Sequence, residues 1–333
     1  MRLIPVIAWT VALALPASAG SVPQFTSAWF VGDSLTDPGN LQSLTGGRLP
    51  PSPPYAGSST NGPVWAQQVA AAFSARGLET GNFAYSYATS IRNDDLAPGL
   101  GRPAALTVQI PDLPDQIESL AAVPKDSLGS APLVSVWTGA NDIFDAIALA
   151  DPGNPAAAAQ SVALAAGAAA TAVAQTVAAL GAAGFGDVLV FNLPALEATP
   201  AFALDTPAAA PLAKFGTDTF NAALAASLGG LKAGPNVIGV DAHAAFEAVL
   251  AAPASYGLSN VTTPCLTSAG LCAPEVAATS FFFDGVHPTT VGHGIITDIV
   301  LDKVSPVPLP ASAWLLVSGL AALAVLSGRR RTA

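Results

Sequence analysis

Residues 30–40, FVGDSLTDPGN, join a β-prone pair to a polar turn. Phe30 and Val31 favour a strand, and the Gly-Asp-Ser that follows favours a turn. A serine at such a turn can protrude from the edge of a sheet, where a base and a substrate can reach its hydroxyl. A serine in this position is more often a turn residue or a helix cap. Ser34 by itself therefore does not establish a nucleophile.

A second polar segment, DGVHPT at residues 284–289, contains His287, one of three histidines in the chain. Neutral imidazole accepts a hydroxyl proton near pH 7, and a carboxylate on its other nitrogen fixes the tautomer. A tight turn or an irregular first helical turn brings Asp284 to this ring. The same residues also fit an aspartate cap on a helix that begins at proline. The other two histidines, His243 and His293, lie in helix-like sequence, and we expect structural or surface roles for them.

Residues 134–142, VSVWTGAND, show a buried-strand pattern that breaks into Gly-Ala-Asn-Asp. The side-chain amide of Asn141, at the end of such a strand, can donate a hydrogen bond to a developing oxyanion. The alternative is an Asx turn or a helix N-cap, which is the more common role of Asn-Asp after a strand.

Strand patterns and helical patterns alternate along the chain. This alternation predicts a three-layer α/β/α sandwich with a mostly parallel central sheet of about five strands. Catalytic groups are then expected at the carboxyl ends of the strands, where Ser34 and Asn141 fall. The Ala-rich run 155–183 is expected to be a long helix that packs against the sheet. The strand patterns lie at 30–31, 78–84, 133–137, 186–192 and 236–241, and the helical patterns at 64–75, 110–122, 155–183, 212–231, 244–250 and 289–303.

The composition excludes two classes of protein. Of the 333 residues, 51% are hydrophobic and 10% are charged, so intrinsic disorder is not expected over most of the chain. The formal net charge is −10, which argues against nucleic-acid binding because that function needs a basic surface.

Taken in order, GDSLTD with Ser34, GAND with Asn141 and DGVHPT resemble the GDSL, or SGNH, hydrolase family. The segment TNGPVW at residues 60–65 resembles one found in the lipase-like branch, and the similarity spans residues 28–303. The resemblance implies the SGNH-hydrolase, flavodoxin-like fold and no metal or cofactor. It makes Ser34 the nucleophile, His287 the base and Asp284 the carboxylate that orients it.

The resemblance also implies three oxyanion donors: the Ser34 backbone N–H, the Asn141 side chain and a backbone N–H in a second block, which we assign to Tyr87. That block, NFAYSYA at residues 82–88, places Ser86-Tyr87 where the family has Gly-Gly. A positive φ at Tyr87 would be costly, because the side chain disfavours that region.

Residues 1–19 resemble an export signal, with Arg2, an apolar run and a small-x-small cleavage pattern ending at Ala19. Export leads to an oxidising compartment. The only two cysteines, Cys265 and Cys272, lie in one Thr/Ser/Pro/Gly-rich loop, so we expect a local disulfide rather than a metal site.

After a hydrolase domain at 20–304, residues 305–333 comprise a Pro-rich linker, an apolar run of bilayer-spanning length and a basic tail. The VPLPA sequence at 307–311 resembles PEP-type C-terminal sorting signals of Gram-negative bacteria. The expectation is a domain facing the periplasm on a membrane anchor, which a sorting protease then removes to leave a cell-surface or secreted protein.

These observations predict a serine ester hydrolase that forms an acyl-enzyme on Ser34. The expected substrate is a small-molecule, lipid or acylated-saccharide ester. Two alternatives remain open. One is acyl transfer to an alcohol or sugar by the same site. The other is a catalytically weak, surface-displayed carbohydrate- or matrix-binding protein, which Ser86-Tyr87 and the C-terminal segment would favour.

Overall fold

The computed structural model describes residues 25–231 and 234–304, and residues 25–304 cluster into one unit. The predicted export signal at 1–19 and the predicted linker, membrane segment and tail at 305–333 lie outside the described residues.

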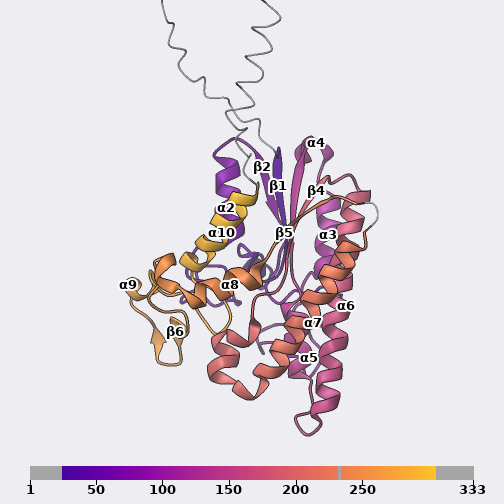
Figure 1. The fold of residues 1–333 in the computed structure, drawn as a ribbon. Helices are drawn as coiled ribbons and strands as arrows, with labels where there is room; N and C mark the ends of the chain where they lie inside the picture. The colour runs from indigo at the N-terminus through magenta and orange to yellow at the C-terminus, as the bar shows by residue number, and fades with distance from the viewer. Residues whose placement is uncertain (1–24, 232–233, 305–333) are drawn as a thin grey trace, which may run out of the picture. The chain divides into compact units, whose positions relative to one another are not determined.

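A five-stranded sheet with all four pairings parallel forms the centre of this unit (Figure 1). The strand order is β2-β1-β3-β4-β5, which confirms the predicted parallel sheet. The strands are β1 (Ser27–Gly32), β2 (Glu79–Asn82), β3 (Pro132–Trp137), β4 (Asp187–Phe191) and β5 (Asn236–Val240).

Helices cover both faces of the sheet, as the three-layer prediction requires (Figure 1). Strand side chains alternate between the faces. Val31 and Val136, for example, pack into the core beneath α3 (Leu113–Ala121), α5 (Ala140–Ala148), α6 (Pro155–Ala182) and α7 (Ala210–Gly229). Phe30 and Trp137 pack into the opposite core, beneath α2 (Trp65–Ser74) and α10 (Thr290–Val304).

Helix α6 is long and apolar enough to cross a membrane by length and composition, and among the described helices it is the one that meets this test. Its buried side chains, including Val162, Val173 and Val177, belong to the core cluster that also contains sheet residues. The prediction of a helix packed against the sheet is therefore confirmed.

Helix α3 begins three residues later than the predicted 110–122. Asp112 forms its N-cap, and a capping box links the Asp112 N–H to a carboxylate oxygen of Asp115 at 3.1 Å. Pro111 precedes this cap. Other described helices had no predicted counterpart: α1 (Asn40–Leu44), α4 (Lys125–Leu128), α5, α9 (Pro274–Ala277) and the short helices η1 (Leu196–Ala198), η2 (Ala201–Asp205), η3 (Pro207–Ala209) and η4 (Pro253–Tyr256). Helix α8 spans Ala242–Ala251, around the predicted 244–250.

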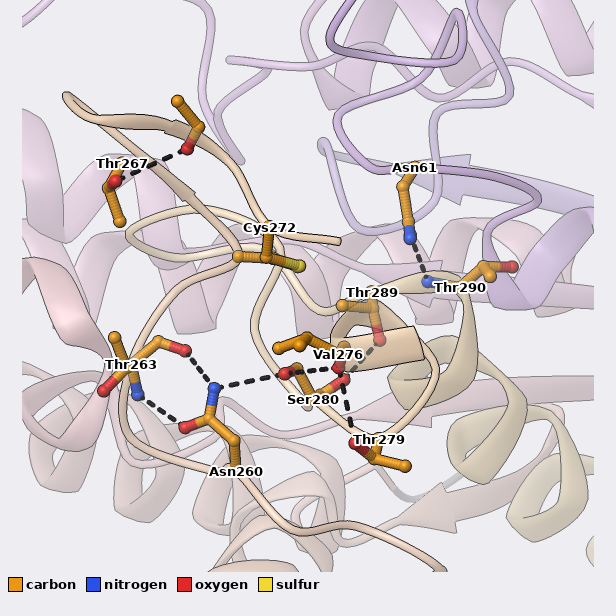
Figure 2. The surroundings of a disulfide bond; sticks show 12 residues. Asn61, Asn260, Thr263, Thr267, Cys272, Val276, Thr279, Ser280, Thr289 and Thr290 are labelled. Atoms are coloured by element: carbon orange, nitrogen blue, oxygen red, sulfur yellow. Dashed lines mark hydrogen bonds between the residues drawn. A yellow bond between two sulfur atoms is a disulfide. The ribbon is translucent and has the colours of Figure 1, made fainter. Parts of the chain in front are cut away.

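Cys265 and Cys272 form the predicted disulfide, which closes a small hairpin of β6 (Leu266–Thr267) and β7 (Gly270–Leu271). The hairpin is tied to the segment before Asp284, since the Cys265 N–H donates to the Phe282 carbonyl at 3.1 Å. Figure 2 shows that residues just before the hairpin also contact this segment: the Asn260 side chain donates to the Thr263 carbonyl at 2.7 Å and to the Ser280 hydroxyl at 3.1 Å. The disulfide thus supports the segment that leads to Asp284.

Candidate active site

Ser34, His287 and Asp284 form a continuous hydrogen-bonded chain. The Ser34 Oγ lies 2.8 Å from His287 Nε2, although 253 positions separate the two residues. His287 Nδ1 lies 2.9 and 2.8 Å from the two carboxylate oxygens of Asp284. The structure therefore brings together the three side chains that the sequence motifs predict to converge.

The turn that presents Ser34 is fixed from both sides. Strand β1 ends at Gly32, whose N–H donates to the Gln116 side chain at 2.8 Å and whose carbonyl accepts from it at 2.9 Å. A Cβ at Gly32, which has φ +155°, would overlap the carbonyl oxygen of Trp137. Only glycine fits this position, so the glycine of the GDS motif lets β1 approach β3 closely just before the serine.

Asp284 caps a turn and does not cap a helix. Its Oδ1 accepts from the N–H groups of Val286 at 2.9 Å and His287 at 2.8 Å, while α10 begins only at Thr290. The alternative of a helix that begins at Pro288 is therefore wrong. One carboxylate holds both the backbone and the ring of His287, because the tight turn places all three donors on the same side.

The TNGPVW segment fixes the chain after His287. The Thr60 hydroxyl donates to the Pro288 carbonyl at 2.7 Å, and the Thr290 N–H donates to the Asn61 side chain at 2.8 Å (Figure 2). A Cβ on Gly62 would approach Thr290 to 3.0 Å. This segment thus positions the loop that carries the imidazole.

Tyr55 also reaches the site, although no sequence motif predicts it. Its hydroxyl donates to Asp284 Oδ2 at 2.9 Å, and its ring meets Phe283 edge-on at a centroid distance of 5.2 Å. Tyr55 lies in the Pro/Gly/Ser-rich stretch 43–63, which follows the serine turn. A contact of this kind depends on the path of an irregular loop, which local sequence does not specify.

The Asp284–His287 pair favours a protonated imidazole. Burial alone would lower the pKa of His287, but the Asp284 carboxylate, together with smaller effects of Asp33 and Asp37, outweighs it and holds the pKa above its usual value. Burial alone would raise the pKa of Asp284, but the charge of His287 and hydrogen bonds from its turn hold it below its usual value. This is the electrostatic arrangement in which a carboxylate stabilises imidazolium.

The other histidines are not placed to act as the base. His293 lies in α10, and burial, with a smaller effect of the charge of His287, lowers its pKa to about 3, so it stays neutral. His243 lies in α8, where its Nδ1 is 3.6 Å from Glu247.

Asp37, the last residue of GDSLTD, organises the block 82–88. Its buried carboxylate accepts from the N–H groups of Gly39 and Asn40 at 2.8 and 2.6 Å. It also accepts from both the N–H and the hydroxyl of Ser86 at 2.8 Å. The Ser86 N–H is therefore occupied, which leaves that of Tyr87 as the next donor. Sequence reasoning quoted Asp37 within the motif but gave it no role.

Tyr87 adopts the backbone conformation that its side chain disfavours. Its φ is 70°, and it is the one non-glycine residue with positive φ among residues 25–231 and 234–304. This is the left-handed region that glycine, the family residue here, adopts without strain. Tyr87 thus has a backbone conformation suited to glycine, and neither Tyr87 nor Ser34 donates its N–H to another described residue.

Arg102 holds the Tyr87 ring. Its guanidinium lies over that ring, 5.6 Å from the centroid. Asp145 binds this guanidinium through two contacts of 2.8 and 2.7 Å, and Asp95 through one of 3.2 Å. Arg102, in the polar segment 86–103, is thus held over the Tyr87 ring by two carboxylates.

Asn141 presents its side chain from the first turn of α5, after an N-cap at Gly139. The predicted alternative, in which Asn141 is itself the cap, is therefore wrong. Its Nδ2 donates one hydrogen to the Ala88 carbonyl at 2.8 Å. An amide nitrogen carries two hydrogens, so this bond orients the group and leaves one donor for a ligand.

We expect Tyr87→Gly to be more stable than Tyr87→Ala by about 1 kcal/mol, because alanine keeps the positive-φ strain and glycine does not. Both variants lose the ring, so the comparison isolates the backbone. Urea unfolding of the two proteins measures the difference. An alanine variant at least as stable as the glycine variant would show that the backbone at this position is unstrained.

A cavity of about 80 Å³ opens beside the reactive groups and is lined by Ser34, Asn141 and His287 among others. The hydroxyl that forms the hydrogen-bonded chain is therefore next to space that a ligand can occupy.

A family model described as GDSL-like Lipase/Acylhydrolase matches residues 29–300. The chain belongs to this family. GDSL-like hydrolases act on acyl compounds, as the family description states, and the match spans every site element described above, from Ser34 to His287.

Two curated relatives of this GDSL-like hydrolase are similar in sequence. A phosphatidylcholine-sterol acyltransferase of Aeromonas hydrophila is 36% identical over 133 residues, which cover 40% of this chain and 37% of that protein. A thermolabile hemolysin of Vibrio parahaemolyticus serotype O3:K6 is 25% identical over 292 residues, 82% of this chain and 62% of that protein. The chain spans less than two thirds of the length of either relative.

Solved structures of esterases and hydrolases are similar in outline. An acetylxylan esterase from Geobacillus stearothermophilus gives a TM-score of 0.40 at 15% identity, covering 84% of this chain and 94% of that one. An alpha/beta hydrolase enzyme from the metagenome of Lake Arreo, Spain, gives 0.40 at 18% identity, covering 86% and 100%.

Proposed function

We propose that this GDSL-like hydrolase is a serine ester hydrolase that works through an acyl-enzyme on Ser34. The observation that carries the proposal is the unbroken chain from the Ser34 hydroxyl through His287 to Asp284, with contacts of 2.8 Å on either side of the ring. Catalysis by such a chain needs a serine, a base within hydrogen-bond reach and a group that orients the base.

In the first half-reaction, His287 Nε2 takes the Ser34 proton as Oγ attacks the ester carbonyl carbon. The oxyanion that forms accepts from the N–H groups of Ser34 and Tyr87 and from the free Nδ2 hydrogen of Asn141. The ester C–O bond then breaks, and His287 returns its proton to the leaving alcohol. Asp284 stabilises imidazolium between these steps.

In the second half-reaction, His287 takes a proton from water, whose oxygen attacks the acyl-enzyme. The bond to Ser34 breaks, the serine recovers its proton from His287, and the carboxylic acid leaves. No other reactant is consumed.

Acyl transfer to an alcohol is the second candidate, and the relative named as a phosphatidylcholine-sterol acyltransferase favours it. An alcohol or sugar hydroxyl would then replace water in the second half-reaction. A catalytically weak binding protein receives less support, because Tyr87 keeps the backbone conformation of glycine and its N–H stays available.

The test is hydrolysis of a panel of esters by the purified protein, with and without an alcohol acceptor. Release of free acid in water supports the hydrolase, and an acylated acceptor formed in preference to acid supports the transferase. A protein that turns over no ester but binds a polysaccharide would overturn both.

We expect kcat/KM for ester hydrolysis to fall as pH falls through the pKa of His287, because only the neutral ring accepts the serine proton. Since Asp284 raises that pKa, the acidic limb of the plot of kcat/KM against pH should have its midpoint above pH 6.5. Asp284→Asn removes the carboxylate charge and should move the limb to lower pH. If the midpoint of the limb is unchanged in this variant, Asp284 does not raise the pKa of the catalytic base.

We also propose that the protein is exported, tethered by residues 305–333 and then released to the cell surface or medium by a sorting protease. This rests on the sequence of residues 1–19 and 305–333. Fractionation of the native host with an antibody against the hydrolase domain tests it, and a protein confined to the cytosol would overturn it.

A further inference from the structure

Most of the polar residues that line the cavity beside Ser34 belong to the reactive site. Its polar lining residues are Asp33, Ser34, Asn141, Thr199 and His287, and four of these five belong to the triad, to the serine turn or to the oxyanion donors. The remaining lining is almost entirely aliphatic and aromatic. A ligand that fills the cavity therefore has one polar end, held at the reactive serine, and an apolar body.

The apolar lining comes from three hydrophobic clusters, one of which is the core beneath α3, α5, α6 and α7. Trp137, Phe191 and Val240, at the ends of β3, β4 and β5, belong to the core beneath α2 and α10. Phe246 and Val249 of α8 belong to another cluster. Protein interiors are normally close-packed, so a gap where three such clusters meet, next to a nucleophile, is a place for a ligand.

We infer that this cavity binds the hydrocarbon chain of the acyl group, which makes the preferred substrates esters of fatty acids with several methylene groups rather than acetates. This rests on the proposed function. One water molecule needs roughly 10–15 Å³ of such space, so a cavity of about 80 Å³ holds several methylene groups.

The geometry assigns the two sides of the ester. The acyl carbon is bonded to Ser34 Oγ in the acyl-enzyme, and its chain enters the cavity past Asn141 and His287. The alcohol then lies outside this cavity, whose lining includes neither Tyr55 nor any residue of the polar segment 86–103. The cavity thus selects the length of the acyl chain, and residues outside the cavity contact the alcohol.

Ala245 offers a direct test because it lines the cavity from α8, whereas Ala248 on the same helix is exposed and does not. Ala245→Leu fills the cavity, and Ala248→Leu is the matched control with the same change of residue. The substrates are p-nitrophenyl acetate, butanoate and octanoate, used with the full-length protein.

For the unmodified protein we expect kcat/KM to rise about fourfold per added methylene until the cavity is full. Ala245→Leu should lower the octanoate-to-acetate ratio of kcat/KM by roughly tenfold. Ala248→Leu should keep the ratio of the unmodified protein. Melting temperatures of both variants show whether each is folded.

Equal rates on acetate and octanoate in the unmodified protein, or an unchanged ratio in folded Ala245→Leu, would overturn the acyl pocket while leaving the ester hydrolase in place. Absence of turnover on all three esters overturns the proposed function itself. The chain-length series needs no variant, so the inference stays testable even if Ala245→Leu does not fold.

Discussion

Ser34→Ala is expected to lower kcat for p-nitrophenyl ester hydrolysis by at least about 10³-fold and to abolish labelling by a fluorophosphonate probe. The hydroxyl is the group that forms the covalent intermediate, and alanine has no atom in its place. Rates are measured spectrophotometrically, and labelling on a fluorescent gel.

Ser43→Ala is the matched control, because Ser43 is exposed and its hydroxyl donates to the Gly39 carbonyl, its one hydrogen bond among the described residues. It should keep full labelling. Persistent labelling of the Ser34 variant at another residue would remove Ser34 from the role proposed for it.

Asn141→Ala is expected to lower kcat by about 10²–10³-fold with little change in KM. The oxyanion exists in the transition state and not in the bound ester, so the lost hydrogen bond affects turnover more than affinity. Steady-state kinetics with a short ester measure both constants.

The same substitution removes the bond from Asn141 to the Ala88 carbonyl, so a purely structural effect must be separated from a catalytic one. A denaturation curve measures the structural part. A rise in KM with kcat unchanged would contradict the assignment of Asn141 as an oxyanion donor.

The sheet and its helices were predictable because their side-chain periods are local. Alternating or continuous apolar runs such as 133–137 and 186–192 became β3 and β4, and the apolar run of 155–183 became α6. The predicted boundaries of helices were wrong where capping residues determine the first helical residue. Asp112 starts α3 later than its periodicity indicates, because its N–H and carbonyl enter the capping pattern there.

The convergence of Ser34, His287 and Asp284 was predictable from motif order and from the rule that parallel strands bring their carboxyl ends to one edge. The contacts that surround these three residues were not predictable. Tyr55 reaches Asp284 through an irregular loop, and Asp37 collects donors from residue 86, far along the chain. Such contacts depend on tertiary packing, and a single sequence specifies them only through the whole fold.

The Cys265–Cys272 bridge makes the preparation of this enzyme depend on its redox surroundings. In a host whose cytosol reduces thiols, the hairpin at 265–272 would be held by hydrogen bonds alone. The chain-entropy model assigns closure of a loop of this separation, seven residues, about 2 kcal/mol. The disulfide stabilises the segment that leads to Asp284. Protein prepared with reductant should therefore lose activity at a lower temperature than protein from an oxidising compartment.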